Sequence, residues 1–165
     1  MNVILCGFMG CGKSTIGKAL SKKTNYKFID LDEYIENSQK MRISDIFDKF
    51  GEDEFRKIES QSINEICKLE NHIISLGGGA VLNPKNVEIL KTCGKLFFLN
   101  ISANEVYNRL KDDTTRPLLQ TDDKLGAISN LLNKRLPIYT SVADVVIDVD
   151  NKNIEEIADE LLKNL

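Results

Sequence analysis

Short apolar runs alternate with longer stretches of helical periodicity along this chain of 165 residues. The short runs are rich in β-branched and aromatic residues, which favours β-strands. We expect strands at residues 2–6, 27–29, 72–76, 95–101 and 145–149. The unbroken apolar run from Leu96 to Leu99 is typical of a central strand that is covered on both faces.

The stretches between these runs carry apolar residues at helical spacing. They predict helices at residues 13–24, 32–39, 43–50, 52–69, 84–92, 103–110, 125–140 and 154–162. Alternating strands and helices are typical of right-handed βαβ units, with helices on both faces of a parallel sheet. The predicted fold class is therefore α/β, with three layers in the order α/β/α.

Residues 111–124 fit this alternation poorly. They read KDDTTRPLLQTDDK, with many Asp and Thr residues, one proline and little amphipathic period. This composition predicts a mobile surface loop. Since no repeat, low-complexity tract or linker divides the chain, we expect one domain over residues 1–165.

Composition narrows the classes of partner. The chain is 42% hydrophobic and 28% charged, as in globular proteins, and its net charge is −3 with a pI near 5.3. An acidic balance argues against a general polyanion binder, so we expect no nucleic-acid partner. No apolar stretch reaches membrane-spanning length, and the N-terminus opens on an apolar strand without a basic leader. We therefore expect a cytoplasmic protein without membrane association.

The four cysteines do not form a recognisable metal site. They lie at 6, 11, 67 and 93 without paired ligand spacing, and the single His72 cannot complete a common zinc site. We expect free thiols that are buried or half-buried, in a reducing compartment.

The strongest motif is GFMGCGKS at residues 7–14, which matches G-x-x-x-x-G-K-[ST]. It follows a predicted strand and precedes a predicted helix, so its backbone N–H groups and the helix dipole can face phosphate oxygens. Lys13 is expected to reach the β- and γ-phosphates of a nucleotide, and the Ser14 hydroxyl to bind Mg²⁺. The alternative is a glycine-rich turn that binds no ligand.

Two aspartates follow the second predicted strand. In Phe28-Ile29-Asp30-Leu31-Asp32, the carboxylates of Asp30 and Asp32 can share one pocket at the edge where open α/β sheets bind ligands. One could hold Mg²⁺ and the other could accept a proton from a substrate hydroxyl. Alternatively, Asp32 only caps the following helix.

Several cations and a glycine triplet follow. Arg56 could bind a carboxylate ligand through two parallel N–H groups, or could only pair with Glu59 one helical turn away. Residues 77–79 are Gly-Gly-Gly, which permits close approach of a ligand to the backbone. Arg116 and Arg135 add two further cations that could face anions, although isolated surface arginines usually have no function.

Together these segments resemble the shikimate kinase family over nearly the whole chain. The motifs are G-x-M-G-x-G-K-S at 7–14, F-x-D-x-D at 28–32, F-R-x-x-E at 55–59, G-G-G at 77–79, R-P-L-L at 116–119 and R-x-x-x-Y-x-x-x-A-D at 135–144. The resemblance implies a P-loop kinase fold like that of nucleoside monophosphate kinases. It further implies a five-stranded parallel sheet, an acceptor-binding region at about 32–60 and a lid at about 111–124. Leu76 departs from the small or hydroxyl residue expected before the glycine triplet, although Ser75 is adjacent.

The resemblance also implies roles for individual residues. The implied catalytic residues are Lys13, Asp32 and Arg116, and the implied metal-side residues are Ser14 and Asp30. The implied nucleotide-binding residues are Gly10, Cys11, Gly12, Lys13, Ser14, Thr15, Arg109 and Arg116. The implied shikimate-binding residues are Asp32, Phe47, Phe55, Arg56, Glu59, Gly77, Gly78, Gly79 and Arg135.

The expected reaction is in-line transfer of the ATP γ-phosphoryl group to the 3-hydroxyl of shikimate, with Mg²⁺, in chorismate and aromatic amino acid synthesis. We expect a monomer whose partners are these small molecules. Two alternatives stay open. One is another small P-loop kinase, acting on gluconate or a nucleoside monophosphate. The other is a nucleotide-binding module without transfer activity, although the guanine-reading N-K-x-D is lacking, since Asn151-Lys152-Asn153 has no Asp.

Overall fold

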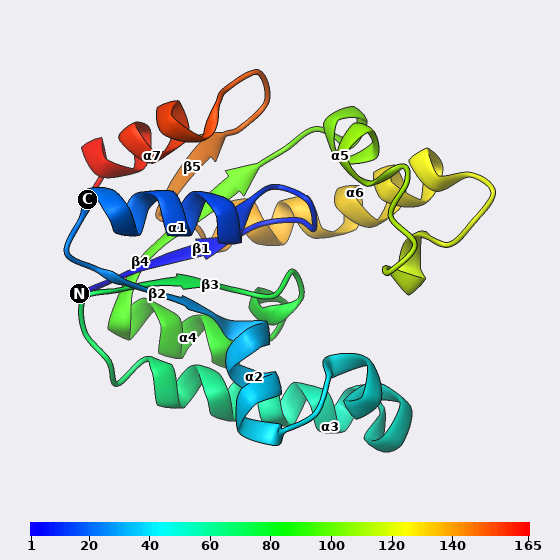
Figure 1. Ribbon diagram of the computed structural model, residues 1–165, viewed down its shortest axis with the longest axis horizontal. Helices are drawn as coiled ribbons and strands as arrows, with labels where there is room; N and C mark the ends of the chain where they lie inside the picture. The colour runs from blue at the N-terminus through cyan, green and yellow to red at the C-terminus, as the bar shows by residue number, and fades with distance from the viewer.

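The computed structural model describes residues 1–165, and Figure 1 shows a central sheet flanked by helices. Five strands form one all-parallel sheet in the order β2-β3-β1-β4-β5. Their bounds are β1 Asn2–Cys6, β2 Lys27–Asp30, β3 His72–Ser75, β4 Gly94–Asn100 and β5 Val145–Asp148. The predicted α/β class and all five predicted strands are confirmed, with ends that differ by one residue at most.

Seven α-helices connect and cover the strands. They are α1 Lys13–Lys23, α2 Leu31–Gln39, α3 Ile43–Ile66, α4 Pro84–Cys93, α5 Ala103–Leu110, α6 Lys124–Val142 and α7 Ile154–Lys163. Helices α1 and α7 pack together on one face of the sheet, whereas α3, α4 and α6 lie on the other (Figure 1). This arrangement confirms the three layers.

Helix α3 covers two of the predicted helices. It runs from Ile43 to Ile66 but has a kink at Gly51, whose φ of 82° and ψ of 172° are not helical. The break predicted between residues 50 and 52 is therefore present as a kink. The predicted end at Leu69 is wrong, because the helix ends at Ile66 with Cys67 as its C-cap. Four residues later, Asn71 takes a left-handed φ of 58° directly before β3.

Residues 111–123 form a largely exposed segment without strand or α-helix, as expected of a surface loop, but the segment contains one short helix that was not predicted. A 3₁₀ helix spans Pro117–Leu119, and Leu119 is buried although most of its neighbours are exposed. A second 3₁₀ helix at Ala80–Leu82, directly after the glycine triplet, was also not predicted. Single turns of this kind lack the amphipathic period by which longer helices are found in a sequence.

The core extends over both faces of the sheet. All five residues of β1 are buried, as are Leu96, Phe97, Phe98 and Leu99 of β4. The predicted free thiols are confirmed, with Cys6 and Cys11 buried and the other two half-buried. No helix combines the length and apolarity that a bilayer crossing requires.

Candidate active site

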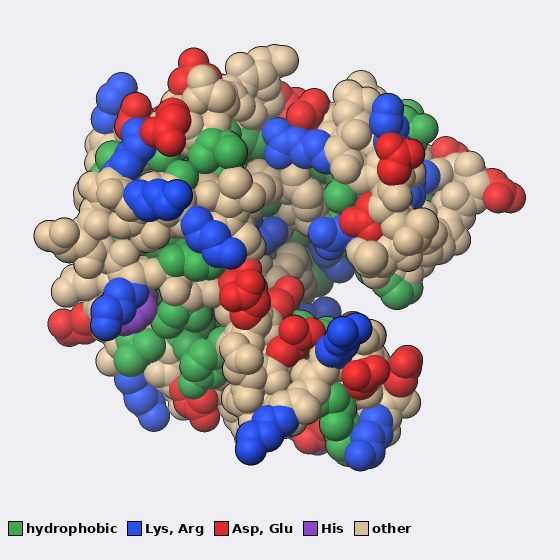
Figure 2. All heavy atoms as spheres, viewed as in Figure 1, with side chains coloured by type: hydrophobic (Ala, Val, Ile, Leu, Met, Phe, Trp, Pro, Cys, Tyr) green, Lys and Arg blue, Asp and Glu red, His purple; other side chains and the backbone are tan.

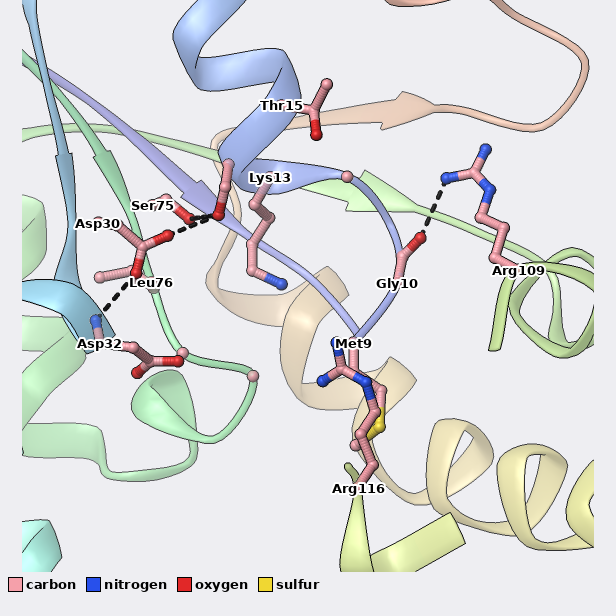
Figure 3. Close-up of a pocket in the computed structure, with 14 residues that line it drawn as sticks. Met9, Gly10, Lys13, Thr15, Asp30, Asp32, Ser75, Leu76, Arg109 and Arg116 are labelled. Atoms are coloured by element: carbon pink, nitrogen blue, oxygen red, sulfur yellow. Dashed lines mark hydrogen bonds between the residues drawn. The ribbon is translucent and has the colours of Figure 1, made fainter. Parts of the chain in front are cut away.

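A polar pocket of about 440 Å³ opens at the carboxyl ends of β1, β2 and β3. Figure 2 shows this side of the molecule hollowed into a cleft with Lys and Arg side chains inside it. Figure 3 shows that the pocket wall comes from the loop after β1, the ends of β2 and β3, and the region around α5. The lining residues are Met9, Gly10, Gly12, Lys13, Ser14, Thr15, Asp30, Asp32, Ser75, Leu76, Gly77, Gly78, Arg109 and Arg116.

The loop between β1 and α1 has the geometry that its glycines were expected to allow. Gly10 and Gly12 have φ values of 78° and 92°, which side chains with a Cβ adopt only under strain. Lys13 starts α1, and its Nζ donates to the carbonyl oxygens of Gly7 at 2.9 Å and Phe8 at 3.2 Å. The loop therefore sets an ammonium group and a helix N-terminus beside one cavity, which suits a phosphate chain.

Cys11 takes a different place from its neighbours. Its side chain is buried and does not line the pocket, while its backbone N–H donates to the Phe8 carbonyl at 3.2 Å. The Cys11 side chain is therefore placed to shape the loop and not to contact a ligand in the pocket.

The Ser14 hydroxyl, in the first turn of α1, lies near side-chain oxygen atoms at the ends of β2 and β3. It donates to Asp30 Oδ2 at 2.5 Å, and Ser75 Oγ lies 3.5 Å away (Figure 3). Carboxylate and hydroxyl oxygens are the donors that Mg²⁺ takes from proteins, usually with several waters. This donor set fits Mg²⁺ beside the phosphate loop. Leu76, where a small or hydroxyl residue was expected, is buried. The neighbouring Ser75, at the end of β3, places its hydroxyl beside Ser14 instead.

Asp30, and not Asp32, caps helix α2. The Asp30 side chain accepts hydrogen bonds from the backbone N–H groups of Asp32 at 3.0 Å and Glu33 at 3.4 Å. The alternative that Asp32 serves only as a helix cap is therefore wrong. Both carboxylates do line the pocket, but across a strand-to-helix junction and not along an extended strand.

The Asp32 carboxyl has an environment that favours its protonated form. The surrounding protein raises its pKa chiefly by burial, and the negative charge of Asp30 raises it further, while Lys13 and Arg56 oppose the shift. A carboxylate whose pKa is raised toward neutral is a better proton acceptor at physiological pH than an ordinary aspartate.

The raised pKa of Asp32 predicts an effect on stability. Because burial penalises its charge, the carboxyl favours folding most at low pH, and this contribution is lost as the pH rises through the folded-state pKa. Asp32→Asn is therefore expected to raise the thermal unfolding midpoint at pH 8, but only slightly, because Asp32 is exposed to the open pocket and solvent there screens its charge. Melting curves at pH 8 and pH 3.5 test this, and an advantage equal at both values would contradict it.

The glycine triplet joins this pocket to the two predicted carboxylate-binding arginines. A Cβ built on Gly79 would lie 2.6 Å from Arg56 Nη2, and one on Gly78 would lie 3.4 Å from Arg135 Nη1. A Cβ on Gly77 would lie 3.0 Å from Asp32 Oδ1. All three side chains therefore approach the backbone of the triplet, and a side chain on these residues would crowd them.

Arg56 makes the ion pair that the sequence left open, and it also faces the triplet. Its Nη1 donates to Glu59 Oε2 at 2.8 Å, and Glu59 is only 1% exposed. Burial raises the pKa of Glu59, and the hydrogen bond and charge of Arg56 oppose that rise. Glu59 thus holds the guanidinium through Nη1, whereas Nη2 lies beside Gly79 and 3.6 Å from Glu52 Oε1.

Tyr139 fixes the other side of the triplet. Its hydroxyl donates to the Gly78 carbonyl at 2.6 Å, and its ring stacks on Phe98 with centroids 5.1 Å apart. Burial raises the pKa of Tyr139 to about 12, so the hydroxyl stays a donor at neutral pH. Arg135, one turn earlier on α6, lies over the ring of Phe8 at 6.0 Å from its centroid.

Phe47 and Phe55 lie behind Arg56. Their ring centroids are 4.6 Å apart, and the Arg56 guanidinium carbon lies 5.3 Å from the centroid of Phe55. Phe55 is buried in the core and neither ring is among the pocket-lining residues. The structure thus places both rings as packing for the Arg56 side of the site.

Two arginines line the pocket on the side of the phosphate loop. Arg109 Nη1 donates to the Gly10 carbonyl at 3.0 Å, and its Nε donates to Glu105 at 2.9 Å. Arg116 lines the pocket from the segment after α5 and donates to Asp113 Oδ2 at 3.2 Å. Met9, Tyr139 and Asp113 were given no role from the sequence. Met9 lies inside the P-loop motif and Tyr139 inside the motif at 135–144, so these places could have indicated a role, whereas Asp113 lies in neither motif.

Arg109→Ala is expected to weaken ATP binding. The change removes a cation from the pocket and one hydrogen bond to the phosphate loop, each an effect of about 1 kcal/mol. We expect the KM for ATP to rise roughly 30-fold with the acceptor KM unchanged. Steady-state kinetics measure both constants, and a rise confined to the acceptor would contradict the placement of Arg109.

The chain resembles known proteins over almost its full length. A family model described as shikimate kinase matches residues 9–165. A shikimate kinase of Thermodesulfovibrio yellowstonii is 44% identical over 98% of this chain and 93% of the relative. One of Caldicellulosiruptor bescii is also 44% identical, with the same shares covered.

A solved structure agrees with these relatives. The shikimate kinase of Acinetobacter baumannii in complex with shikimate aligns with a TM-score of 0.92 and 32% identity, over 99% of this chain and 91% of that one. The family model, the relatives and the solved structure all match nearly the whole chain, including most of the phosphate loop and the other segments that line the pocket. The chain belongs to the shikimate kinase family.

Proposed function

We propose that this protein transfers the γ-phosphoryl group of ATP to the 3-hydroxyl of shikimate, giving shikimate 3-phosphate and ADP. The observation that carries the proposal is the position of Asp32, at 3.0 Å from a Cβ built on Gly77. Asp32 lies in the phosphate-loop pocket, and the adjoining Gly78 and Gly79 touch Arg135 and Arg56. A hydroxyl at Asp32 and a carboxylate at the two arginines would belong to one compact hydroxy acid.

The nucleotide end would hold the triphosphate. Backbone N–H groups of Gly10, Gly12, Ser14 and Thr15 and the Lys13 ammonium would contact the phosphates, with Arg109 closing the site. Ser14 and Asp30 would hold Mg²⁺, with Ser75 alongside. When bound, the ion supplies positive charge against the phosphate oxygens.

The acceptor end would orient the attacking hydroxyl. Arg56 and Arg135 would bind the shikimate carboxylate across Gly78 and Gly79, and Glu59 would keep Arg56 in place. Asp32 would accept the proton of the 3-hydroxyl as its oxygen attacks phosphorus. Arg116 and Lys13 would stabilise the negative charge of the transferring phosphoryl group.

The remaining parts of the proposal concern organisation. We propose one domain over residues 1–165, with the acceptor region at about 32–60 and a lid at about 111–124 that closes over the nucleotide. Closure would exclude water and so limit ATP hydrolysis. We further propose a monomeric, cytoplasmic enzyme of chorismate synthesis.

An acceptor panel tests the reaction. ADP release is measured with Mg-ATP and shikimate, gluconate, AMP, CMP or no acceptor, and the product is identified by mass. We expect ADP only with shikimate, together with shikimate phosphate. Turnover only with gluconate or a nucleotide would contradict the substrate, and ATP binding without any turnover would favour a binding module.

A further inference from the structure

Lys124, the first residue of α6, joins the two ends of the proposed lid. Its Nζ donates to three backbone carbonyls, those of Leu110 at 2.8 Å, Lys111 at 3.1 Å and Asp113 at 2.7 Å. Leu110 is the last residue of α5, where helical carbonyls lack partners and a positive charge is favourable. One ammonium group therefore ties the end of α5 and the start of the lid to α6.

Asp113 continues this connection to Arg116. Its carboxylate accepts hydrogen bonds from the Thr115 backbone at 2.7 Å, the Thr115 hydroxyl at 2.6 Å and Arg116 Nε at 3.2 Å. Gln120 Nε2 donates to the carbonyls of Asp113 at 3.3 Å and Arg116 at 3.2 Å. Lys124 thus holds the backbone carbonyl of Asp113, and the Asp113 carboxylate holds Arg116.

The end of α5, which Lys124 contacts, also lies beside the phosphate loop. The side chain of Leu110 would be 3.1 Å from a Cβ on Gly10, and Arg109 donates to the Gly10 carbonyl. Arg116 and Met9 of that loop line the same pocket (Figure 3). A chain of hydrogen bonds therefore connects Lys124 through Asp113 to Arg116, which lines the pocket beside this loop.

We propose that Lys124 is a positioning residue for phosphoryl transfer, acting through Asp113 to hold Arg116 at the phosphate loop. The inference rests on the proposed function, because Arg116 is the group whose charge the reaction would use. A misplacement of about 1 Å in such a group costs roughly 100-fold in rate. Loss of Lys124 is thus expected to lower kcat without a matching change in the KM for shikimate.

The test compares Lys124→Met, which keeps the length of the side chain, with the wild-type protein. We expect kcat to fall roughly 10- to 100-fold, with the KM for shikimate unchanged. Lys124→Arg keeps charge and donors and is expected to recover most of the loss. Lys111→Met is the matched control, because Lys111 is exposed and its side chain makes no ion pair.

A double-mutant cycle with Arg116→Gln separates positioning from general structure. If Lys124 acts through Arg116, adding Lys124→Met to Arg116→Gln costs little further rate. An equal loss of kcat in both backgrounds, or no loss in the single variant, would overturn the inference. Absence of shikimate turnover in the wild-type protein would instead overturn the proposed function, so the two failures are distinguishable.

Discussion

Asp32→Asn is expected to remove nearly all phosphoryl transfer while Mg-ATP binding stays unchanged. The amide has the size of the carboxyl but cannot accept the proton of the attacking hydroxyl. Positioned general bases contribute about 10²–10⁴ in rate, so we expect kcat to fall by that factor. Single-turnover kinetics with shikimate, together with nucleotide titration, measure the two effects separately.

Glu33→Gln is the matched control for this result. Glu33 is the next acidic residue on α2, is exposed and does not line the pocket. Its variant is expected to retain wild-type kcat. Unchanged turnover in Asp32→Asn would remove Asp32 from the mechanism, and loss of ATP affinity in that variant would place its role on the nucleotide instead.

Arg56→Ala is expected to have the second large effect, on the acceptor. A charge-assisted hydrogen bond contributes about 1.5–3 kcal/mol, so loss of a two-bond contact to the shikimate carboxylate predicts a KM raised roughly 100-fold or more. The KM for ATP is expected to stay constant, because Arg56 lies at Gly79 and does not line the pocket beside the phosphate loop. Initial-rate kinetics with each substrate varied in turn measure both.

Removal of Arg56 also leaves Glu59 buried without its partner. This loss is expected to destabilise the fold, so the double variant Arg56→Ala/Glu59→Gln is needed to separate stability from binding. Lys57→Ala is the control, since Lys57 is exposed and pairs only with Glu54. An unchanged acceptor KM in a folded Arg56 variant would refute the carboxylate clamp.

Periodicity and motif context were enough to predict most of the fold. The five strands alternate with amphipathic helices, and each signal is local to its own segment. The phosphate loop could be predicted equally well, because its glycines, Lys13 and Ser14 lie within one eight-residue motif. The kink at Gly51 was predicted as a break between two helices for the same reason.

Contacts between side chains from different segments were harder to predict from the sequence. The sequence could not decide whether Arg56 pairs with Glu59 or faces a ligand, and the structure places it against both Glu59 and Gly79. It could not assign the cap of α2 to Asp30, since Asp30 and Asp32 have the same chemistry. These outcomes depend on side-chain directions that one-dimensional patterns do not contain.

Residues 111–124, the proposed lid, also combine features that a sequence shows with contacts that only the fold creates. The Asp and Thr residues of the lid correctly ruled out a long helix, but they also form the hydrogen bonds that order the segment around Asp113. Lys124 belongs to that network only because α6 begins beside the end of α5.

The most direct test of the site is a crystal structure of the protein with ADP and shikimate. We expect the shikimate carboxylate to bind both Arg56 and Arg135 across Gly78 and Gly79. The 3-hydroxyl should lie within hydrogen-bond distance of Asp32 and face the β-phosphate of ADP. A shikimate whose carboxylate contacts neither arginine, or whose 3-hydroxyl points away from Asp32, would contradict the account.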